Sequence, residues 1–151
     1  MVNVDLKLLK QLRDETAASI ADCRRALEEG DGDYKKAVAW LKKRAVEKAE
    51  KKKDRETTEG VIESYIHNGG KVGVLVELLC ETDFVAKTDE FKHLAKEIAL
   101  QIAAMDPKDV DTLLKQEYIR DAGQTIEQVV KGVIGKLGEN ITVKRFVRFE
   151  I

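Results

Sequence analysis

The spacing of the apolar residues changes near Gly60, and this change constrains the fold more than any other feature of the chain. Before Gly60, apolar residues recur at the three- and four-residue spacing of amphipathic helices. From residue 61 to residue 67 the pattern follows a period of two, and Asn68-Gly69-Gly70 separates it from a β-branched and leucine-rich run ending at Cys80. Asn-Gly favours the positive φ values of tight hairpin turns. The sequence therefore predicts a helical region followed by a β-hairpin.

The first 55 residues are predicted to form a helical module that continues into a charged helix. Polar residues that can cap helices separate three short apolar stripes. Thr16 or Ser19 can cap the second helix, and Asp31 or Asp33 can cap the third. The pattern of the third helix then runs on into a lysine-rich segment, residues 42–55.

The lysine-rich segment has two interpretations. It can be a solvated helical stalk between two domains, with Glu47 and Lys51 paired one turn apart. It can also be a basic helix that binds RNA. Acidic residues are interleaved among the lysines and the run lacks aromatic residues, so we favour the stalk and expect no direct contact with nucleic acid.

Charge and hydropathy argue against two other classes of partner. The formal net charge is −1, which gives no overall drive toward nucleic acid or acidic membranes. No apolar run approaches the roughly 20 residues that span a bilayer, so we expect no membrane contact and a cytoplasmic protein.

Residues 56–151 are predicted to form an α+β core, in which a three-stranded antiparallel sheet packs on helices. Thr88 is expected to cap one helix, and Thr125 with Gln128 forms a capping box at the start of another. Residues 141–151 alternate and predict the third strand. We expect one apolar face on it: Ile141, Val143, Val147, Phe149 and Ile151.

No combination of side chains indicates an enzyme. His67 and His93 are the only histidines, and neither has a partner at the spacing of a metal site. Cys80 and His67 could form a nucleophile and base across the hairpin, but a cysteine packed in the core is the more common situation. Cys23 is interpreted in the same way, as a reduced thiol. We therefore expect no catalytic residue, no metal and no cofactor.

The segment from Glu77 to Lys87 joins the end of a strand to the start of a helix. Phe84 stands at this turn beside Asp83, although large apolar side chains usually lie inside regular elements. Such a pair can act as an apolar wedge with a polar tip that enters another protein. The alternative is ordinary packing of Phe84 under the next helix.

Three segments of the chain resemble motifs of the elongation factor Ts family, and they occur in the family's order. They are Leu12-Arg13-x-x-Thr16 with Asp22 to Leu27, Glu77 to Lys87, and Gly135 to Ile141 with Arg145-Phe146. The resemblance implies a three-helix module similar to ubiquitin-associated (UBA) domains and its charged stalk over residues 1–55. It implies a dimerisation core over residues 56–151.

The resemblance also implies a function and a site. The protein would be a guanine-nucleotide exchange factor for elongation factor Tu, and no bond would be made or broken. Phe84 would be the wedge beside the partner's nucleotide-bound magnesium, and Asp83 would be its polar anchor. The expected partner-binding residues are Leu12, Arg13, Thr16, His67, Thr82, Asp83, Phe84 and Val85.

The chain departs from the family pattern at several places. Thr16-Ala-Ala-Ser19 stands where Thr-Gly-Ala-Gly is usual, and Leu79 stands where Asn is common. The stretch between Tyr118 and Thr125 is short, and one core half is present where many members have two. Pairing with a second copy would cover the sheet, so we expect a homodimer. Two other functions remain open: an adaptor that binds proteins through the helical module, and an RNA-binding translation accessory.

Overall fold

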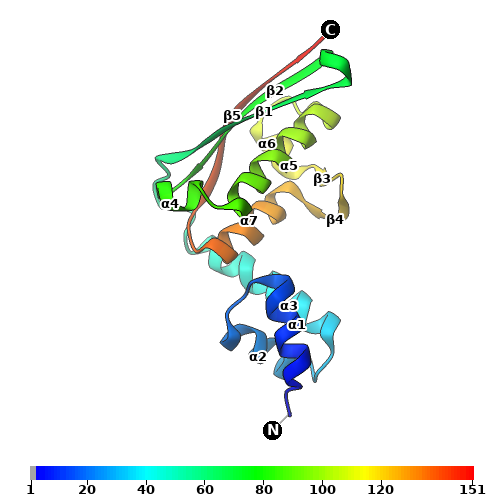
Figure 1. Ribbon diagram of the computed structural model, residues 1–151, viewed down its shortest axis with the longest axis vertical. Coiled ribbons are helices and arrows are strands. Elements are labelled where there is room, and N and C mark those ends of the chain that lie inside the picture. Colours follow the sequence, from blue (N-terminus) through cyan, green and yellow to red (C-terminus); the bar gives the residue numbers. More distant parts are fainter. Residues whose placement is uncertain (1–2) are drawn as a thin grey trace.

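The computed structural model describes residues 3–151, which form a helical module and an α+β core joined by one long helix (Figure 1). The module contains α1 (Leu6–Thr16), α2 (Ile20–Glu29) and the first half of α3 (Tyr34–Glu50). Of the predicted capping residues, Ser19 caps α2 and Asp33 caps α3. Thr16, the other candidate for α2, is the last residue of α1.

A small core of its own holds the module together. The three helices all contribute buried side chains to it, namely Leu12, Cys23, Ala26, Leu27, Ala37 and Leu41. A core of this size is marginal by itself. The predicted helical module is confirmed, and its stability depends in part on how α3 is anchored to the rest of the chain.

The second half of α3 is docked on the core rather than solvated on all sides. It packs along α7 (Ile126–Leu137), where a Cβ added at Gly135 would lie 2.7 Å from the Cβ of Ala45. Ala49 is buried in the main core, and Glu50 pairs with Lys131 at 2.5 Å. The helix joins the two parts of the chain, but its face toward α7 is packed rather than solvated, which differs from the expected solvated stalk.

The polar face of α3 also differs from expectation. Glu47 pairs with Arg44 at 3.4 Å, three residues earlier, whereas Lys51 already lies beyond the last residue of the helix. The predicted pair between Glu47 and Lys51 is therefore replaced by a pair within the helix.

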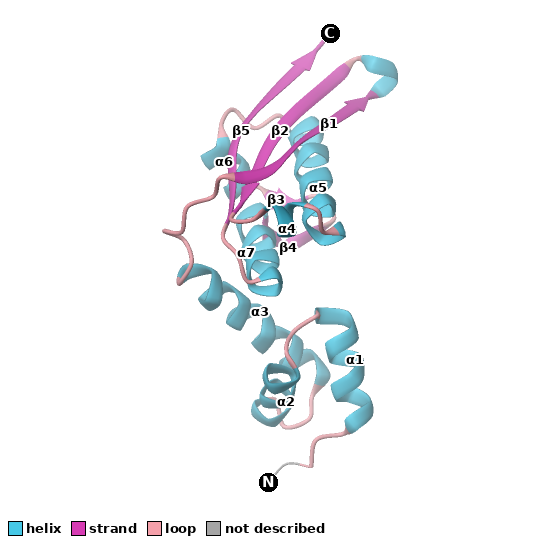
Figure 2. Ribbon diagram, turned by 60° about the vertical axis from the view of Figure 1, so that its left-hand side comes forward, coloured by secondary structure: helices cyan, strands magenta, loops and turns pink. Residues whose placement is uncertain are grey.

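The core is a three-stranded antiparallel sheet covered by helices on one face (Figure 2). The sheet order is β1 (Glu59–His67), β2 (Val72–Cys80) and β5 (Ile141–Glu150). Asn68, Gly69 and Gly70 join β1 to β2, and all three have positive φ, as the Asn-Gly signal predicts. The predicted α+β class and the antiparallel sheet are confirmed.

Helices follow the hairpin and cover its inner face. A single-turn helix, α4 (Asp83–Ala86), comes first, and α5 (Asp89–Met105) lies against β1 and β2. Next come α6 (Val110–Lys115) and a small unpredicted sheet of β3 (Glu117–Tyr118) and β4 (Asp121–Thr125), which leads into α7. Phe91, Leu94, Ile98 and Ile102 of α5 are almost fully buried beneath the sheet.

Strand β5 does not present one continuous apolar face. Its pairing with β2 slips between Glu77 and Leu78, so that Lys144 is the extra residue of a β-bulge. Before the bulge Ile141 and Val143 point into the core; beyond it Val147 and Phe149 are exposed. The predicted face is wrong beyond residue 143, because one extra residue reverses the alternation of side chains.

Candidate functional site

Helix α4 presents Phe84 to the solvent. The ring is 83% exposed, whereas the next two side chains, Val85 and Ala86, are buried in the core. The two buried residues anchor the turn and leave Phe84 on its outer side. The alternative of Phe84 packed beneath the following helix is therefore wrong for this chain.

Two polar residues shape the same turn. The Thr82 hydroxyl accepts from the Val85 N–H at 3.3 Å and so caps α4. The Asp83 carboxylate lies beside the Phe84 ring in sequence and pairs with Lys87 at 2.7 Å, one turn later. This hydrogen-bonded contact with Asp83 raises the pKa of Lys87. The site therefore combines an exposed ring with a carboxylate whose only ion-pair partner among residues 3–151 is an exposed lysine side chain.

The candidate contact residues of the module lie on α1. Arg13 is exposed, whereas Leu12 is fully buried in the core of the module. The Thr16 hydroxyl donates to the Leu12 carbonyl at 2.6 Å and accepts from the Ala18 N–H at 3.3 Å, so it shapes the turn into α2.

Two of the predicted contact residues have buried side chains. Leu12 and Val85 both lie inside the chain's own cores, at 0% and 6% exposure, so neither side chain is available to a partner in this conformation. They act as packing residues that support their exposed neighbours, Arg13 and Phe84.

His67 is remote from the α4 turn. It lies at the turn end of β1, opposite Val72, whereas Cys80 at the other end of β2 leads to α4. The two ends of the hairpin are well separated in Figure 1. The His67 ring stacks on Tyr65 and shares a hydrogen bond of 2.7 Å with its hydroxyl. His67 therefore belongs to a different surface from Phe84.

The cysteines lie in packing environments. Burial raises the pKa of Cys80 to about 11 and also raises that of Cys23, which disfavours the reactive thiolate in both. His67 and Cys80 stand at opposite ends of the hairpin, so a nucleophile–base pair is not formed. Within residues 3–151, no three His, Cys, Asp or Glu side chains gather in a way that could hold a metal ion.

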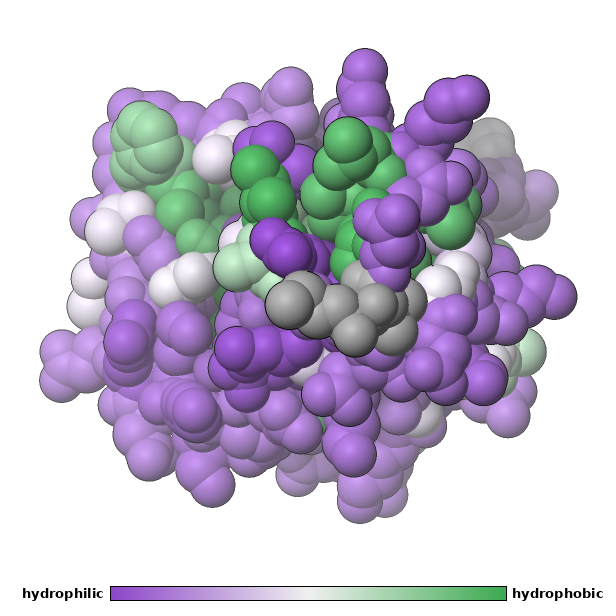
Figure 3. All heavy atoms as spheres, turned by 90° about the horizontal axis from the view of Figure 1, so that it is seen from below, coloured by the Kyte–Doolittle hydropathy of each residue, from purple (hydrophilic) through white to green (hydrophobic). Residues whose placement is uncertain are grey.

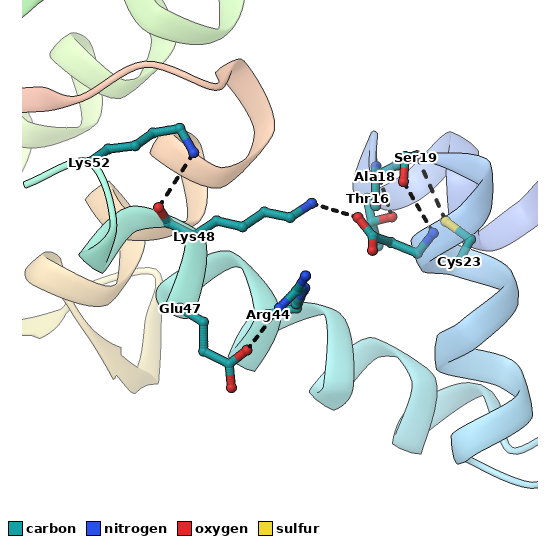
Figure 4. A network of polar contacts seen from close by, with 9 residues as sticks. Thr16, Ala18, Ser19, Cys23, Arg44, Glu47, Lys48 and Lys52 are labelled. Atoms are coloured by element: carbon teal, nitrogen blue, oxygen red, sulfur yellow. Dashed lines mark hydrogen bonds and ion pairs between the residues drawn. The ribbon is translucent and has the colours of Figure 1, made fainter.

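A cleft of about 1080 Å³ separates the module from the core. The turn from Thr16 to Ser19 lines one side, and α7 lines the other. Lys48 of α3 and Asp22 of α2 both line the cleft and pair at 2.5 Å, and Figure 4 shows Lys48 in its network of polar contacts. This ion pair lowers the pKa of Asp22 and ties the module to the docked part of α3.

Several exposed apolar residues escaped the sequence reasoning. On the outer face of the sheet they are Ile62, Ile66 and Leu75, and they lie on the same face as Val147 and Phe149, which were expected on the apolar face of the last strand. On the module they are Leu6 and Ile20, and Figure 3 shows that apolar side chains gather on one side of this otherwise hydrophilic end. Leu6 stands two turns before Arg13 on α1, a spacing that could have pointed to it.

The fold and the exposed turn define a class: a two-part α+β protein, with a helical module and a core of sheet and helices, that carries an exposed aromatic side chain on α4. In the part of the chain that the structure describes, no helix is long and apolar enough to cross a membrane.

Comparison with known proteins identifies the family. A family model described as elongation factor TS matches residues 81–151. The elongation factor Ts of Oleidesulfovibrio alaskensis is 40% identical over 196 aligned positions, which cover 100% of this chain and 99% of the relative. That of Rippkaea orientalis is 39% identical and covers 99% of this chain and 78% of the relative. The chain belongs to the elongation factor Ts family.

The relatives differ in how much of them this chain spans. The elongation factor Ts of Nostoc sp. is 46% identical over 151 residues, but these make up only 48% of that protein. The chain therefore spans about half of the Nostoc relative and nearly all of the one from O. alaskensis.

Proposed function

We propose that this protein is a guanine-nucleotide exchange factor, which promotes the release of GDP from elongation factor Tu in the cytoplasm. The observation that carries the proposal is the 83% exposure of Phe84, in a member of the elongation factor Ts family. Exchange makes and breaks no covalent bond, so it requires none of the acid, base or nucleophilic groups of an enzyme.

The proposed mechanism is displacement by the Phe84 ring. A bound nucleoside diphosphate is held by a magnesium ion and by backbone donors around its phosphates. A ring pushed in beside that site displaces these groups, and Asp83 can pair with a polar group at the rim. The factor then lowers the affinity of elongation factor Tu for GDP, and GDP lowers the affinity for the factor by the same ratio. A coupling free energy of about 3 kcal/mol corresponds to a change of about 150-fold in affinity.

The surface proposed for contact is smaller than the sequence suggested. Asp83 and Phe84 form the wedge, and Arg13 and Thr16, with Leu6 on the same side of α1, form a second contact on the module. Thr82 serves as the cap of α4. His67 lies at the far end of the hairpin, so we assign it to a separate and weaker contact.

We also propose that a second copy of the chain covers the outer face of the sheet. Ile66 lies opposite Gly73, which lies opposite Phe149, and Leu75 lies opposite Val147. These neighbouring rows make a continuous apolar surface where a solvated sheet face normally carries polar residues. A two-fold pair would bury the same surface on both copies. Sedimentation as a monomer at micromolar concentration would contradict this.

Release of a fluorescent GDP analogue from elongation factor Tu tests the proposed function. The wild-type protein should accelerate release, and Phe84→Ala should lose most of the acceleration while it remains folded. Met105→Ala is the control, since it shortens a half-exposed apolar side chain at the end of α5, away from α4. Equal rates for Phe84→Ala and the wild type would rule out Phe84 as the wedge.

A further inference from the structure

One carboxylate holds the backbone that leads into α4. Oε1 of Glu139, in the loop between α7 and β5, accepts from the N–H groups of Glu81 at 3.2 Å and Thr82 at 2.9 Å. Its Oε2 accepts from the Thr82 hydroxyl at 2.7 Å. Glu81 and Thr82 lie between the end of β2 and the start of α4, so neither element supplies partners for these donors. Glu139 therefore fixes the two residues from which α4 starts.

The α7–β5 loop is in turn held by the residues that lead into α4 and by those that follow α3. Glu81 accepts from the Asn140 N–H at 2.9 Å. The side-chain amide of Asn140, which is 6% exposed, donates to the carbonyl of Arg55 at 2.9 Å and to that of Lys53 at 3.3 Å. The chain that follows α3, the α7–β5 loop and the residues before α4 thus form one hydrogen-bonded unit.

We infer that Glu139 is a positioning residue for the exchange reaction, which sets the direction of Phe84 through its three hydrogen bonds to Glu81 and Thr82. The inference rests on the proposed function. A helix of one turn has little stability of its own. The Phe84 ring, at 83% exposure, has few neighbours that could orient it, so its direction depends on the backbone beneath it.

The expected kinetic effect follows from this arrangement. A loosely held α4 still meets the partner's surface, but the ring enters the nucleotide site in only a fraction of the complexes. Misplacement of a working group by about 1 Å can cost on the order of a hundredfold in rate. Loss of the Glu139 contacts should therefore lower the maximal rate of GDP release more than the affinity for nucleotide-free elongation factor Tu.

Three variants test the inference in the GDP-release assay. Glu139→Ala should lower the maximal rate about tenfold, within the range that misplacement causes. Glu139→Gln should remain within about threefold of the wild type, because its amide oxygen can still accept from both N–H groups. Glu117→Ala removes an exposed carboxylate that forms no ion pair within residues 3–151, so it should leave the rate unchanged.

A double variant separates positioning from general loss of structure. If Glu139 acts through the ring, Glu139→Ala should have no further effect in a Phe84→Ala background. Amide hydrogen exchange should show faster exchange at Thr82 and Val85 in Glu139→Ala, with exchange in the three-stranded sheet unchanged.

Three results would overturn the inference. They are a wild-type rate for Glu139→Ala, an equal fractional loss in the Phe84→Ala background, and unchanged protection at Thr82 and Val85. If the wild-type protein fails to accelerate GDP release at all, the proposed function fails and the role of Glu139 in exchange fails with it. The hydrogen-exchange result distinguishes that case, since it reports on the contacts of Glu139 without any partner.

Discussion

Arg148 of β5 reaches the last turn of α5 and donates two hydrogen bonds to the carbonyl of Ala103, at 3.0 Å from Nη2 and 3.2 Å from Nε. The bulge at Lys144 makes this possible, since it turns Arg148 toward the helices. A cation at a helix C-terminus also interacts favourably with the helix dipole. The contact ties the last strand to the central helix of the core.

Arg148→Leu should therefore destabilise the protein clearly. The replacement leaves the Ala103 carbonyl without this partner, and loss of a charged hydrogen bond costs about 2 kcal/mol. Urea unfolding followed by circular dichroism measures the change. Arg145→Leu is the control, because Arg145 is highly exposed and its ion pair with Glu77 should contribute less than about 1 kcal/mol. Equal losses in the two variants would contradict the assigned role.

Glu97 should make the stability depend on pH at the acid end. Burial acts to raise the pKa of this carboxyl, but hydrogen bonds from Tyr118 at 2.6 Å and Arg120 at 2.5 Å outweigh it and lower the pKa below 4.5. A lowered pKa contributes stability that is present above the unfolded value and is lost as pH falls through the folded value. The free energy of unfolding should therefore fall with pH below about 4.5. Glu97→Gln should reduce that slope, and an unchanged slope would contradict the assignment.

The hydrogen bond between Tyr118 and Glu97 should also make the stability depend on pH at the alkaline end. Burial and the neighbouring Glu97 carboxylate raise the pKa of Tyr118 to about 12, from 10.0. For a raised pKa the contribution is complete below the unfolded value and is lost as pH rises through the folded one. Between pH 10 and 12, the wild type should lose stability faster than Tyr118→Phe, provided unfolding is reversible there. Spectrophotometric titration of the tyrosines provides an independent check, since Tyr118→Phe should lack one of the tyrosines that ionise only near pH 12.

Ala17 adopts a left-handed backbone at φ 54°, where its N–H donates to the carbonyl of Arg13 at 2.9 Å and closes α1. A Cβ in this conformation costs about 1 kcal/mol, and glycine avoids the cost. Ala17→Gly should therefore raise the free energy of unfolding by up to about 1 kcal/mol. Ala18 does not have a positive φ, so Ala18→Gly should lower the stability instead. A destabilised Ala17→Gly variant would show that the turn gains more from the methyl group than it loses.

Local chemistry explains which elements were predictable from the sequence. Asn68-Gly69, the Thr125 capping box and the periodic stripe of α5 each act within a few residues, and each predicted its element correctly. The β3–β4 sheet depends on contacts distant in sequence, such as Gln101 donating to the Glu117 carbonyl at 3.0 Å, and nothing local indicates it.

The residues of the candidate site also differ in whether the sequence alone could predict their placement. The Asp83–Phe84 turn could be predicted, because an aromatic residue at a strand end is unusual in itself. The burial of Leu12 and Val85 could not, since a side chain on an amphipathic turn can face either way until the packing is known. Glu139 was missed because its partners lie 57 and 58 residues away. The bulge at Lys144 had one sequence signal, the interruption of the alternation at Arg145.

The contact between α3 and α7 leads to the last prediction. A Cβ at Gly135 would lie 2.7 Å from the Cβ of Ala45 and 3.2 Å from its carbonyl oxygen, so the two helices would have to move apart. Gly135→Ala should cost about 1–3 kcal/mol. Gly132, one turn earlier on α7, has no atom within 4 Å of such a Cβ, so Gly132→Ala should stabilise the helix by about 0.5–1 kcal/mol.

Opposite signs for these two alanine variants in urea unfolding would establish close packing between α3 and α7 as the cause. Small-angle scattering should also show a change in the overall dimensions for Gly135→Ala alone, because α3 carries the module. If the α4 turn and the contact on the module must bind one partner at the same time, Gly135→Ala should weaken binding to elongation factor Tu. Tight binding by Gly135→Ala despite altered dimensions would mean that the module and the α4 turn bind independently.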